Sequence, residues 1–146
     1  MLRGNAPTKV DGKGRLKIPN IFRAFLEKEF GVDLFVTSVT GEYVRIYPLS
    51  VWSDIERRLA QVPSTDPSKI KYLDRVNFYG QIAQLDAQGR VVIQPRLRES
   101  AAMQGDVDVF GLYNYLELWN HERFIRRLEQ QPFTDEDGRV LSGFGI

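Results

Sequence analysis

The residues best suited to chemistry in this 146-residue chain form a short motif near its N-terminus, Asp-x-x-Gly-Arg. Asp11 can accept backbone hydrogen bonds across a turn, and Gly14 can adopt a positive φ without a Cβ clash. Arg15 follows directly, and Lys13 and Lys17 flank it. A guanidinium on such a turn can bind phosphate oxygens and guanine edges, so the motif predicts a contact with DNA. An ion pair between Asp11 and Arg15 that only holds the turn together is the structural alternative.

The motif occurs twice. Residues 11–23, DGKGRLKIPNIFR, match residues 86–98, DAQGRVVIQPRLR, at five of thirteen positions, where about one match is expected by chance. The identical pairs, at an offset of 75, are Asp11/Asp86, Gly14/Gly89, Arg15/Arg90, Ile18/Ile93 and Arg23/Arg98. Gln88 and Val92 replace the two lysines in the second copy. We therefore expect the first turn to bind DNA, and the second turn to be mainly structural, with Arg90 paired to Asp86.

Positive charge is concentrated at the N-terminal end of the chain. Residues 1–26 carry a net charge of +5 and the rest of the chain −4, which gives the overall +1. Arg3 and Lys9 belong to this basic arm, and we expect them to contact phosphates. A basic face that interacts only with solvent would give the same charge distribution.

Composition excludes several other kinds of site. The chain has no cysteine and one histidine, which excludes disulfides, thiol nucleophiles and multi-histidine metal clusters. His121 has no obvious triad partner and is predicted to be a surface or capping residue. Residues 12–15 lack the spacing of a phosphate-binding loop, and the acidic residues 135–137 lack that of a calcium loop. The acidic residues are therefore predicted to form a solvated turn.

Each half of the chain predicts the same series of elements around the motif. A short strand (residues 8–10 or 83–85) leads into the turn, a second strand follows, and Pro19 or Pro95 marks the start of a helix. The first of these helices carries Phe22, Phe25, Leu26 and Phe30 on one face and ends at Gly31; its copy is shorter and ends at Gly105.

Two further strands and a second helix complete each half. The strands cover residues 32–39 and 42–47, or 106–113 and 115–119, where the offset between the halves falls to 72. Ser50 or Asn120 is expected to cap the helix that follows. The helices carry Trp52, Ile55 and Leu59, or Phe124, Ile125 and Leu128, and with Trp119 these aromatic residues are predicted to pack rather than to stack on bases.

Composition divides the chain into four parts: a first repeat at residues 1–62, a linker and bridging helix at 63–79, a second repeat at 80–131 and a tail at 132–146. The linker is PSTDPS, and Asp66 followed by Pro67 predicts the start of a helix with Ile70, Leu73 and Val76 on one face. The tail has no strong period, which is consistent with flexibility or with order gained on assembly.

The two copies DGKGRLKIPNIFR and DAQGRVVIQPRLR resemble the paired motifs of the MraZ family of bacterial transcriptional regulators, a duplicated relative of the AbrB-type (SpoVT-AbrB) swapped-hairpin domain. The resemblance covers nearly the whole chain. It implies an α+β fold in which two tandem AbrB-like swapped-hairpin repeats form a pseudo-twofold, β-rich core with flanking helices. It also implies closed rings that bind short direct repeats in the promoter of the cell-division and cell-wall gene cluster. Gln94 departs from the family pattern, because it replaces the first residue of the usual proline pair.

Together these features predict a non-enzymatic, sequence-specific regulator that binds double-stranded DNA, with repression as the expected effect. The expected DNA-binding residues are Arg15, Lys13, Lys17, Lys9, Arg3 and Arg90, and the expected turn residues are Asp11, Gly14, Asp86 and Gly89. No cofactor, metal, small-molecule substrate or membrane is expected, and the predicted location is the cytoplasm, at the nucleoid. The alternative is a structural or adaptor ring that binds protein partners.

Overall fold

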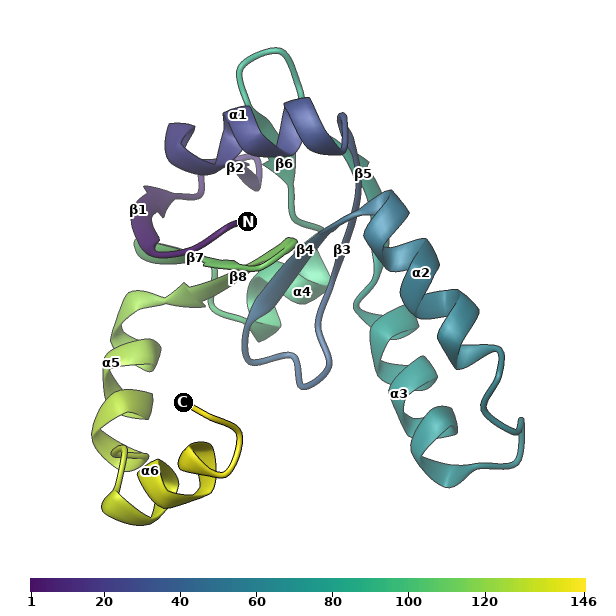
Figure 1. Cartoon of the computed structure of the whole chain (residues 1–146). Helices are drawn as coiled ribbons and strands as arrows, with labels where there is room; N and C mark the ends of the chain where they lie inside the picture. The colour runs from purple at the N-terminus through teal and green to yellow at the C-terminus, as the bar shows by residue number, and fades with distance from the viewer.

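The computed structural model describes residues 1–146. The first half contains β1 (Asn5–Lys9), β2 (Arg15–Lys17), α1 (Asn20–Glu29), β3 (Asp33–Thr37), β4 (Val44–Pro48) and α2 (Leu49–Leu59), and α3 (Pro67–Phe78) follows. The second half contains β5 (Gln81–Gln84), β6 (Arg90–Val92), α4 (Pro95–Ser100), β7 (Asp106–Leu112), β8 (Tyr115–Asn120), α5 (His121–Gln130) and α6 (Asp135–Ser142). The chain is therefore an α+β protein, as the sequence predicted (Figure 1).

The strands form one antiparallel six-stranded sheet, in the order β1-β7-β8-β4-β3-β5, and one two-stranded ribbon, β2-β6. The strand before each turn pairs with the other half of the chain: β1 pairs with β7, and β5 pairs with β3. The ribbon also joins the halves, because β2 comes from the first and β6 from the second. Each half thus depends on the other for its backbone hydrogen bonds.

The pairing register relates the halves symmetrically. Leu16 of β2 lies opposite Val91 of β6, its repeat counterpart at an offset of 75. Arg45 of β4 lies opposite Glu117 of β8, its counterpart at an offset of 72. The strand order is also unchanged when every strand is exchanged for its counterpart. The chain therefore has the strand arrangement expected of two equivalent halves.

Both halves contribute equivalent residues to one hydrophobic core. In the first half these are Leu16, Ile18, Phe22 and Leu26, and in the second half Val91, Ile93, Leu97 and Ala101, all buried. Phe25 and Phe30, on the predicted face of α1, are partly buried against the same core. The periodicity of the repeated motif therefore identified the core face of α1 and of its shorter copy α4.

Helix boundaries confirm most of the predicted signals. The carboxylate of Asp66 accepts hydrogen bonds from the amides of Ser68 and Lys69 at the start of α3, and Asn120 caps α5 through the amide of Arg123. Gln94 is the residue before α4, which begins at Pro95, so the departure from the family pattern still permits a helix there. Gln94 Nε2 also donates to the carbonyl of Tyr79 (2.6 Å).

Two predictions about the helices are wrong. Ser50 does not cap α2, because Pro48 ends β4 in an extended conformation and the helix begins directly at Leu49. The acidic residues 135–137 are not a simple turn: they begin α6, where Thr134 and Asp137 form a capping box.

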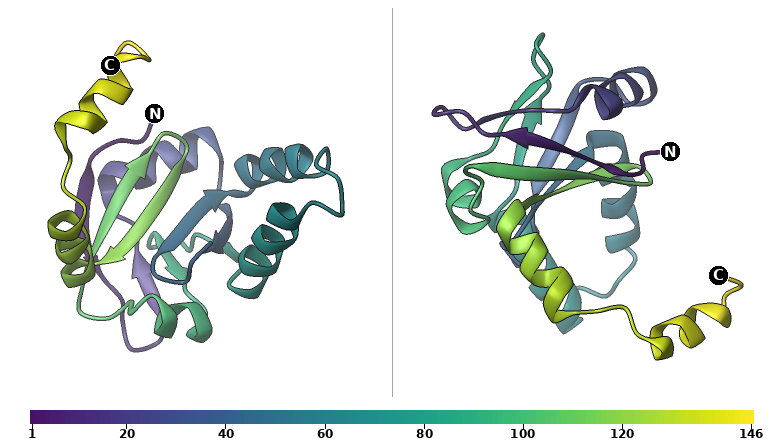
Figure 2. Two further views of the ribbon diagram at one scale, coloured as in Figure 1. Left: turned by 90° about the horizontal axis from the view of Figure 1, so that it is seen from below. Right: turned by 90° about the vertical axis from the view of Figure 1, so that its left-hand side faces the viewer.

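Two helical arms extend from the body that the sheet and ribbon form. One arm consists of α2 and α3 packed side by side, and the other of α5 followed by α6, which projects away from the body (Figures 1 and 2). None of the helices is long and apolar enough to cross a membrane.

Candidate nucleic-acid interface

The first turn is held by a single carboxylate. Asp11 accepts hydrogen bonds from the amides of Lys13 and Arg15, both 2.9 Å, and from Nε of Arg15 at 2.7 Å. The Gly14 amide donates to the carbonyl of Asp11 (3.0 Å), and Gly14 has a φ of +78°. The structure therefore confirms that glycine is needed here for its conformational freedom.

The second turn has the same geometry. Asp86 accepts from the amides of Gln88 (2.9 Å) and Arg90 (2.8 Å) and from Nε of Arg90 (3.0 Å). Gly89 has a φ of +76°. The aspartate–arginine pair is thus present in both turns, so it does not distinguish a DNA-binding copy from a structural one. Any asymmetry between the turns has to come from the flanking residues.

The surroundings of both aspartates lower their pKa and so favour the ionised carboxylate. The hydrogen bond from the Arg15 amide is the largest cause that lowers the pKa of Asp11 to about 2, and the Arg15 guanidinium and the Lys13 amide lower it further. The pKa of Asp86 is lowered mainly by the amide of Arg90, with its guanidinium and the Gln88 amide adding to the effect. Each turn therefore keeps an ionised carboxylate behind its arginine at neutral pH.

The ribbon β2-β6 brings the two turns together. Arg15 lies opposite Val92, and Lys17 lies opposite Arg90, so these four side chains share one face of the ribbon. The other face carries Leu16 and Val91, which are buried in the core. The face away from the core therefore carries three cations from both halves, Arg15, Lys17 and Arg90. The ribbon itself lies beside α1 (Figure 1).

The arginines keep donors free for a ligand. Each uses Nε to bind its aspartate, and Arg15 makes no other side-chain hydrogen bond within the chain. The terminal nitrogens of Arg90 have one long contact, from Nη2 to Oε1 of Gln88 (3.4 Å). Lys13, at the tip of the first turn, and Lys17 are exposed. Each guanidinium is therefore oriented by its aspartate through Nε, while its terminal nitrogens have donors available to a ligand. This arrangement is suited to bidentate contacts with phosphate or guanine.

Two further arginines position the turns, and the sequence interpretation gave them no role. Nη2 of Arg23 donates to the carbonyl of Ala87 in the opposite turn (2.9 Å), while Nε pairs with Glu27 (2.9 Å). Arg98 lies against Gly14 so closely that a Cβ there would overlap its guanidinium. The identity of Arg23 and Arg98 in the repeat was the available signal, because each arginine of α1 or α4 supports the turn of the other half.

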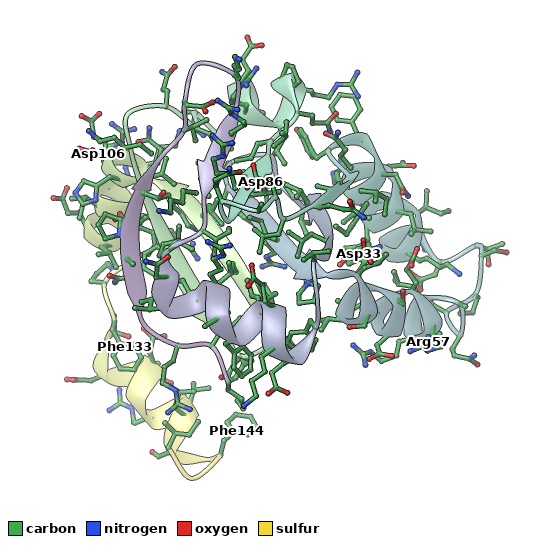
Figure 3. The ribbon with its side chains drawn as sticks, turned by 90° about the horizontal axis from the view of Figure 1, so that it is seen from above. Asp33, Arg57, Asp86, Asp106, Phe133 and Phe144 are labelled. Atoms are coloured by element: carbon green, nitrogen blue, oxygen red, sulfur yellow. The ribbon has the colours of Figure 1, made fainter.

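The remaining candidates lie farther from the ribbon. Lys9 ends β1 next to the first turn and makes an exposed ion pair with Asp106 (3.8 Å), which is labelled in Figure 3. Arg3 precedes β1 at its other end, about 20 Å along the strand from Lys9. Within one chain the structure therefore groups Lys13, Arg15, Lys17 and Arg90, has Lys9 nearby and leaves Arg3 apart.

His121, the one histidine, is the first residue of α5, and its Nδ1 lies 2.7 Å from Oδ2 of Asp108. This hydrogen bond is the main cause that raises the pKa of His121. The side chain is about half exposed at a helix start, which confirms the prediction of a surface residue.

The fold and the site together define a duplicated α+β protein that presents a cationic two-stranded ribbon, a kind of surface that nucleic-acid-binding proteins use. A family model described as "MraZ protein, putative antitoxin-like" matches residues 1–75 and 81–142. The chain therefore belongs to the MraZ family.

Similar proteins cover most or all of the chain. A protein of Acidobacterium capsulatum named transcriptional regulator MraZ is 50% identical over 146 residues, 100% of both chains. A protein of the same name from Koribacter versatilis is 44% identical over 147 residues, again 100% of both chains. One from Chromobacterium violaceum is 36% identical over 124 residues, which covers 85% of this chain and 84% of its own.

Proposed function

We propose that this chain is a DNA-binding regulator of transcription that acts without catalysis. The observation that carries the proposal is the outer face of the β2-β6 ribbon, where Arg15, Lys17 and Arg90 point toward solvent with arginine donors free. Its relatives in Acidobacterium and Koribacter are named transcriptional regulators, which supports the same function here.

In this proposal the two halves are AbrB-like swapped-hairpin repeats, residues 1–62 and 80–131, joined by the linker and bridging helix at 63–79 and followed by the tail at 132–146. The pairing of β1 with β7 and of β5 with β3 supports an exchange of strands between the halves. The position of α3 within residues 63–79 supports a bridging role for that segment.

The proposed target is a set of short direct repeats in the promoter of the cell-division and cell-wall gene cluster, bound by a closed homo-oligomeric ring that represses transcription at the nucleoid. Arg15, Lys13 and Lys17 would contact bases and phosphates, with Lys9, Arg3 and Arg90 adding contacts. One chain presents few free cations, so several copies on successive repeats are needed for tight binding. Linked sites of this kind can increase affinity by about 10²- to 10⁴-fold.

Fluorescence anisotropy over a salt series tests this function. The probes are DNA that carries the direct repeats upstream of the protein's own gene and scrambled DNA of equal length. We expect tighter binding to the repeats and a slope of log K against log salt of about −0.9 for each phosphate contacted. Equal affinity for both probes would contradict sequence-specific binding. A flat salt response would instead favour the adaptor that binds protein.

A further inference from the structure

The two helical arms occupy equivalent places in the two halves but differ in whether a helix covers their aromatic residues. In the first arm, Trp52 of α2 stacks on Phe35 (4.7 Å between ring centroids) and lies 5.1 Å from Tyr47. Helix α3 covers this cluster: Tyr72 lies 6.4 Å from Trp52, and Val76 is buried beside it. The first aromatic cluster is therefore closed by the helix that follows α2.

The second arm repeats the cluster without the cover. Phe124 of α5, the counterpart of Trp52, lies 4.4 Å from Phe110 and 5.8 Å from Trp119. Tyr43 stacks on Trp119 at 5.2 Å, as its counterpart Tyr115 stacks on Tyr47 at 4.8 Å. No residue of α5 is buried. The second cluster thus has the same base as the first but no helix above it.

An open cleft of about 810 Å³ lies beside this second cluster, with Tyr43, Trp119, Arg123, Arg126 and Arg127 among its lining residues; we call it the arginine cleft. The guanidinium of Arg127 lies 4.7 Å from the Trp119 ring.

The repeat relates the arginine cleft to the site that α3 occupies in the first half. At an offset of 72, Arg123 and Arg127 correspond to Val51 and Ile55, which belong to the cluster under α3. The second half therefore has the same site with cations in place of aliphatic side chains. It suits a helix that brings both apolar and acidic residues.

Helix α6 has these properties. When the sequences of α3 and α6 are aligned at their caps, Asp66 and Thr134, Val140 and Leu141 correspond to Tyr72 and Leu73. Phe144, which follows the C-cap Gly143, corresponds to Val76. Val140 is 56% exposed and Phe144 is 78% exposed. The first turn of α6 is acidic, with Asp135 and Glu136. The segment thus presents the apolar pattern of α3 with the opposite charge.

The backbone between α5 and α6 directs α6 away from the arginine cleft of the same chain. Gln131 ends α5 with φ −129° and ψ 65°, and Thr134 is extended, with Pro132 between them. The helical conformation is disfavoured for the residue before a proline, and a tight turn between two packed helices uses that conformation. After α2, in contrast, Ala60 remains helical and the chain turns back. Helix α6 consequently projects from the body (Figure 2). Phe133 and Phe144 lie near its two ends (Figure 3), and both side chains are largely exposed.

We infer that the α6 segment of a second copy of this chain occupies the arginine cleft. Val140, Leu141 and Phe144 cover the second aromatic cluster, and the acidic first turn lies beside Arg126 and Arg127. This inference rests on the homo-oligomer in the proposed function and supplies it with an interface. Exchange of a terminal helix through an extended hinge is a known route to assembly.

Disulfide trapping tests the inference directly, because the chain has no cysteine. Arg127→Cys chains carrying a size tag are mixed with untagged Val140→Cys chains and oxidised. A mixed disulfide is expected, and it joins two copies by construction. The matched control pairs Val140→Cys with Arg57→Cys, an exposed position on α2, and is expected to give little product. Equal disulfide yields from the two pairs overturn the inference. So does a disulfide that forms only within a single chain carrying both Arg127→Cys and Val140→Cys.

Charge reversal provides a second test in the full-length chain. Arg126→Glu with Arg127→Glu, or Asp135→Lys with Glu136→Lys, is expected to shift light scattering toward smaller species, and the four changes together to restore assembly. Asp137 stays unchanged because it caps α6. Unaltered assembly in both double variants refutes this interface, whether or not they lose DNA affinity; lost affinity with intact assembly would assign the cleft to DNA. A monomeric wild type would refute the proposed oligomer as well, whereas an assembled wild type confines the failure to this interface.

Discussion

At the scale of single residues, Asp11 and Asp86 each hold a turn and an arginine together. Each carboxylate accepts two amides and one guanidinium Nε, so backbone and side chain are oriented by the same group. The arginine head then meets a ligand with its orientation already fixed, which reduces the entropy lost on binding. The turns differ in their neighbours: lysines surround Arg15, and Gln88 and Val92 take their places near Arg90.

Replacing the two arginines separately tests this difference. We expect Arg15→Ala to weaken operator binding by about ten- to a hundredfold for each engaged subunit, because a bidentate base contact is lost. Arg90→Ala should weaken it less. Since both arginines pair equally with an aspartate, both variants should lower the melting temperature by a similar small amount. Gel shifts on repeat and scrambled DNA, with thermal melts, measure both effects. Equal losses of affinity would show that the two turns contact DNA alike.

The lowered pKa of Asp11 predicts an effect at acid pH. A carboxylate with a lower pKa in the folded state stabilises that state above its unfolded value, near 3.8, and loses this contribution as the pH falls through about 2. Thermal melts of the wild type and Asp11→Asn between pH 6 and pH 2 should therefore differ most at the upper end and converge toward pH 2. A difference that does not change with pH would show that the turn does not depend on the ionised carboxylate.

At the scale of elements, the turns are supported from the opposite half. Arg23 of α1 contacts the second turn and Arg98 of α4 contacts the first, where each guanidinium lies beside a glycine with positive φ. The reciprocal backbone bonds, from Ile18 to Gly89 (2.8 Å) and from Ile93 to Gly14 (2.9 Å), fix the same contacts. The conformation of each turn and the packing between the two halves therefore depend on the same contacts.

Substitution of Gly14 tests this combination. Gly14→Ala forces an L residue into positive φ and places a Cβ against the Arg98 guanidinium, so we expect a loss of more than about 1 kcal/mol in unfolding free energy. Gly12→Ala, in the same turn, is the matched control, because Gly12 has no positive φ and nothing near its Cβ position. Urea unfolding of both variants gives the comparison. Equal stability of the two variants would contradict the proposed packing constraint.

Local patterns predicted the turns, the core face of α1, the Asp66 and Asn120 caps and the short α4, because each depends on residues close in sequence. The partners of β1 and β5 could not be predicted locally, since a strand of four or five residues does not specify which distant edge it joins. Helix α6 was missed because eight residues with an internal Gly138 give little periodicity. The outward face of the ribbon was likewise hidden, because it requires the register of β2 against β6.

At the scale of the whole molecule, the duplication has made the two halves complementary rather than identical. The centre of the sheet shows this most clearly: Arg45 faces its own repeat counterpart, Glu117, with Nε 2.9 Å from Oε1 and both side chains mostly buried. In a symmetric pair of identical halves this position would place arginine against arginine or glutamate against glutamate. Like charges directly opposite on neighbouring strands are destabilising.

A chain divided between Ser64 and Thr65 in the exposed linker tests this complementarity. Alone, residues 1–64 lack the partners of β1 and β2, and residues 65–146 lack those of β5 and β6. We expect neither fragment to melt cooperatively by circular dichroism, and an equimolar mixture to recover a cooperative transition. Doubling the concentration of one fragment should not restore folding when the other is absent. Two copies of the same fragment would place like charges opposite each other at position 45 or 117. Fragments carrying Arg45→Glu and Glu117→Arg should again fold together, whereas either variant fragment with a wild-type partner should not. A lone fragment that folds cooperatively would show that the halves are independent domains.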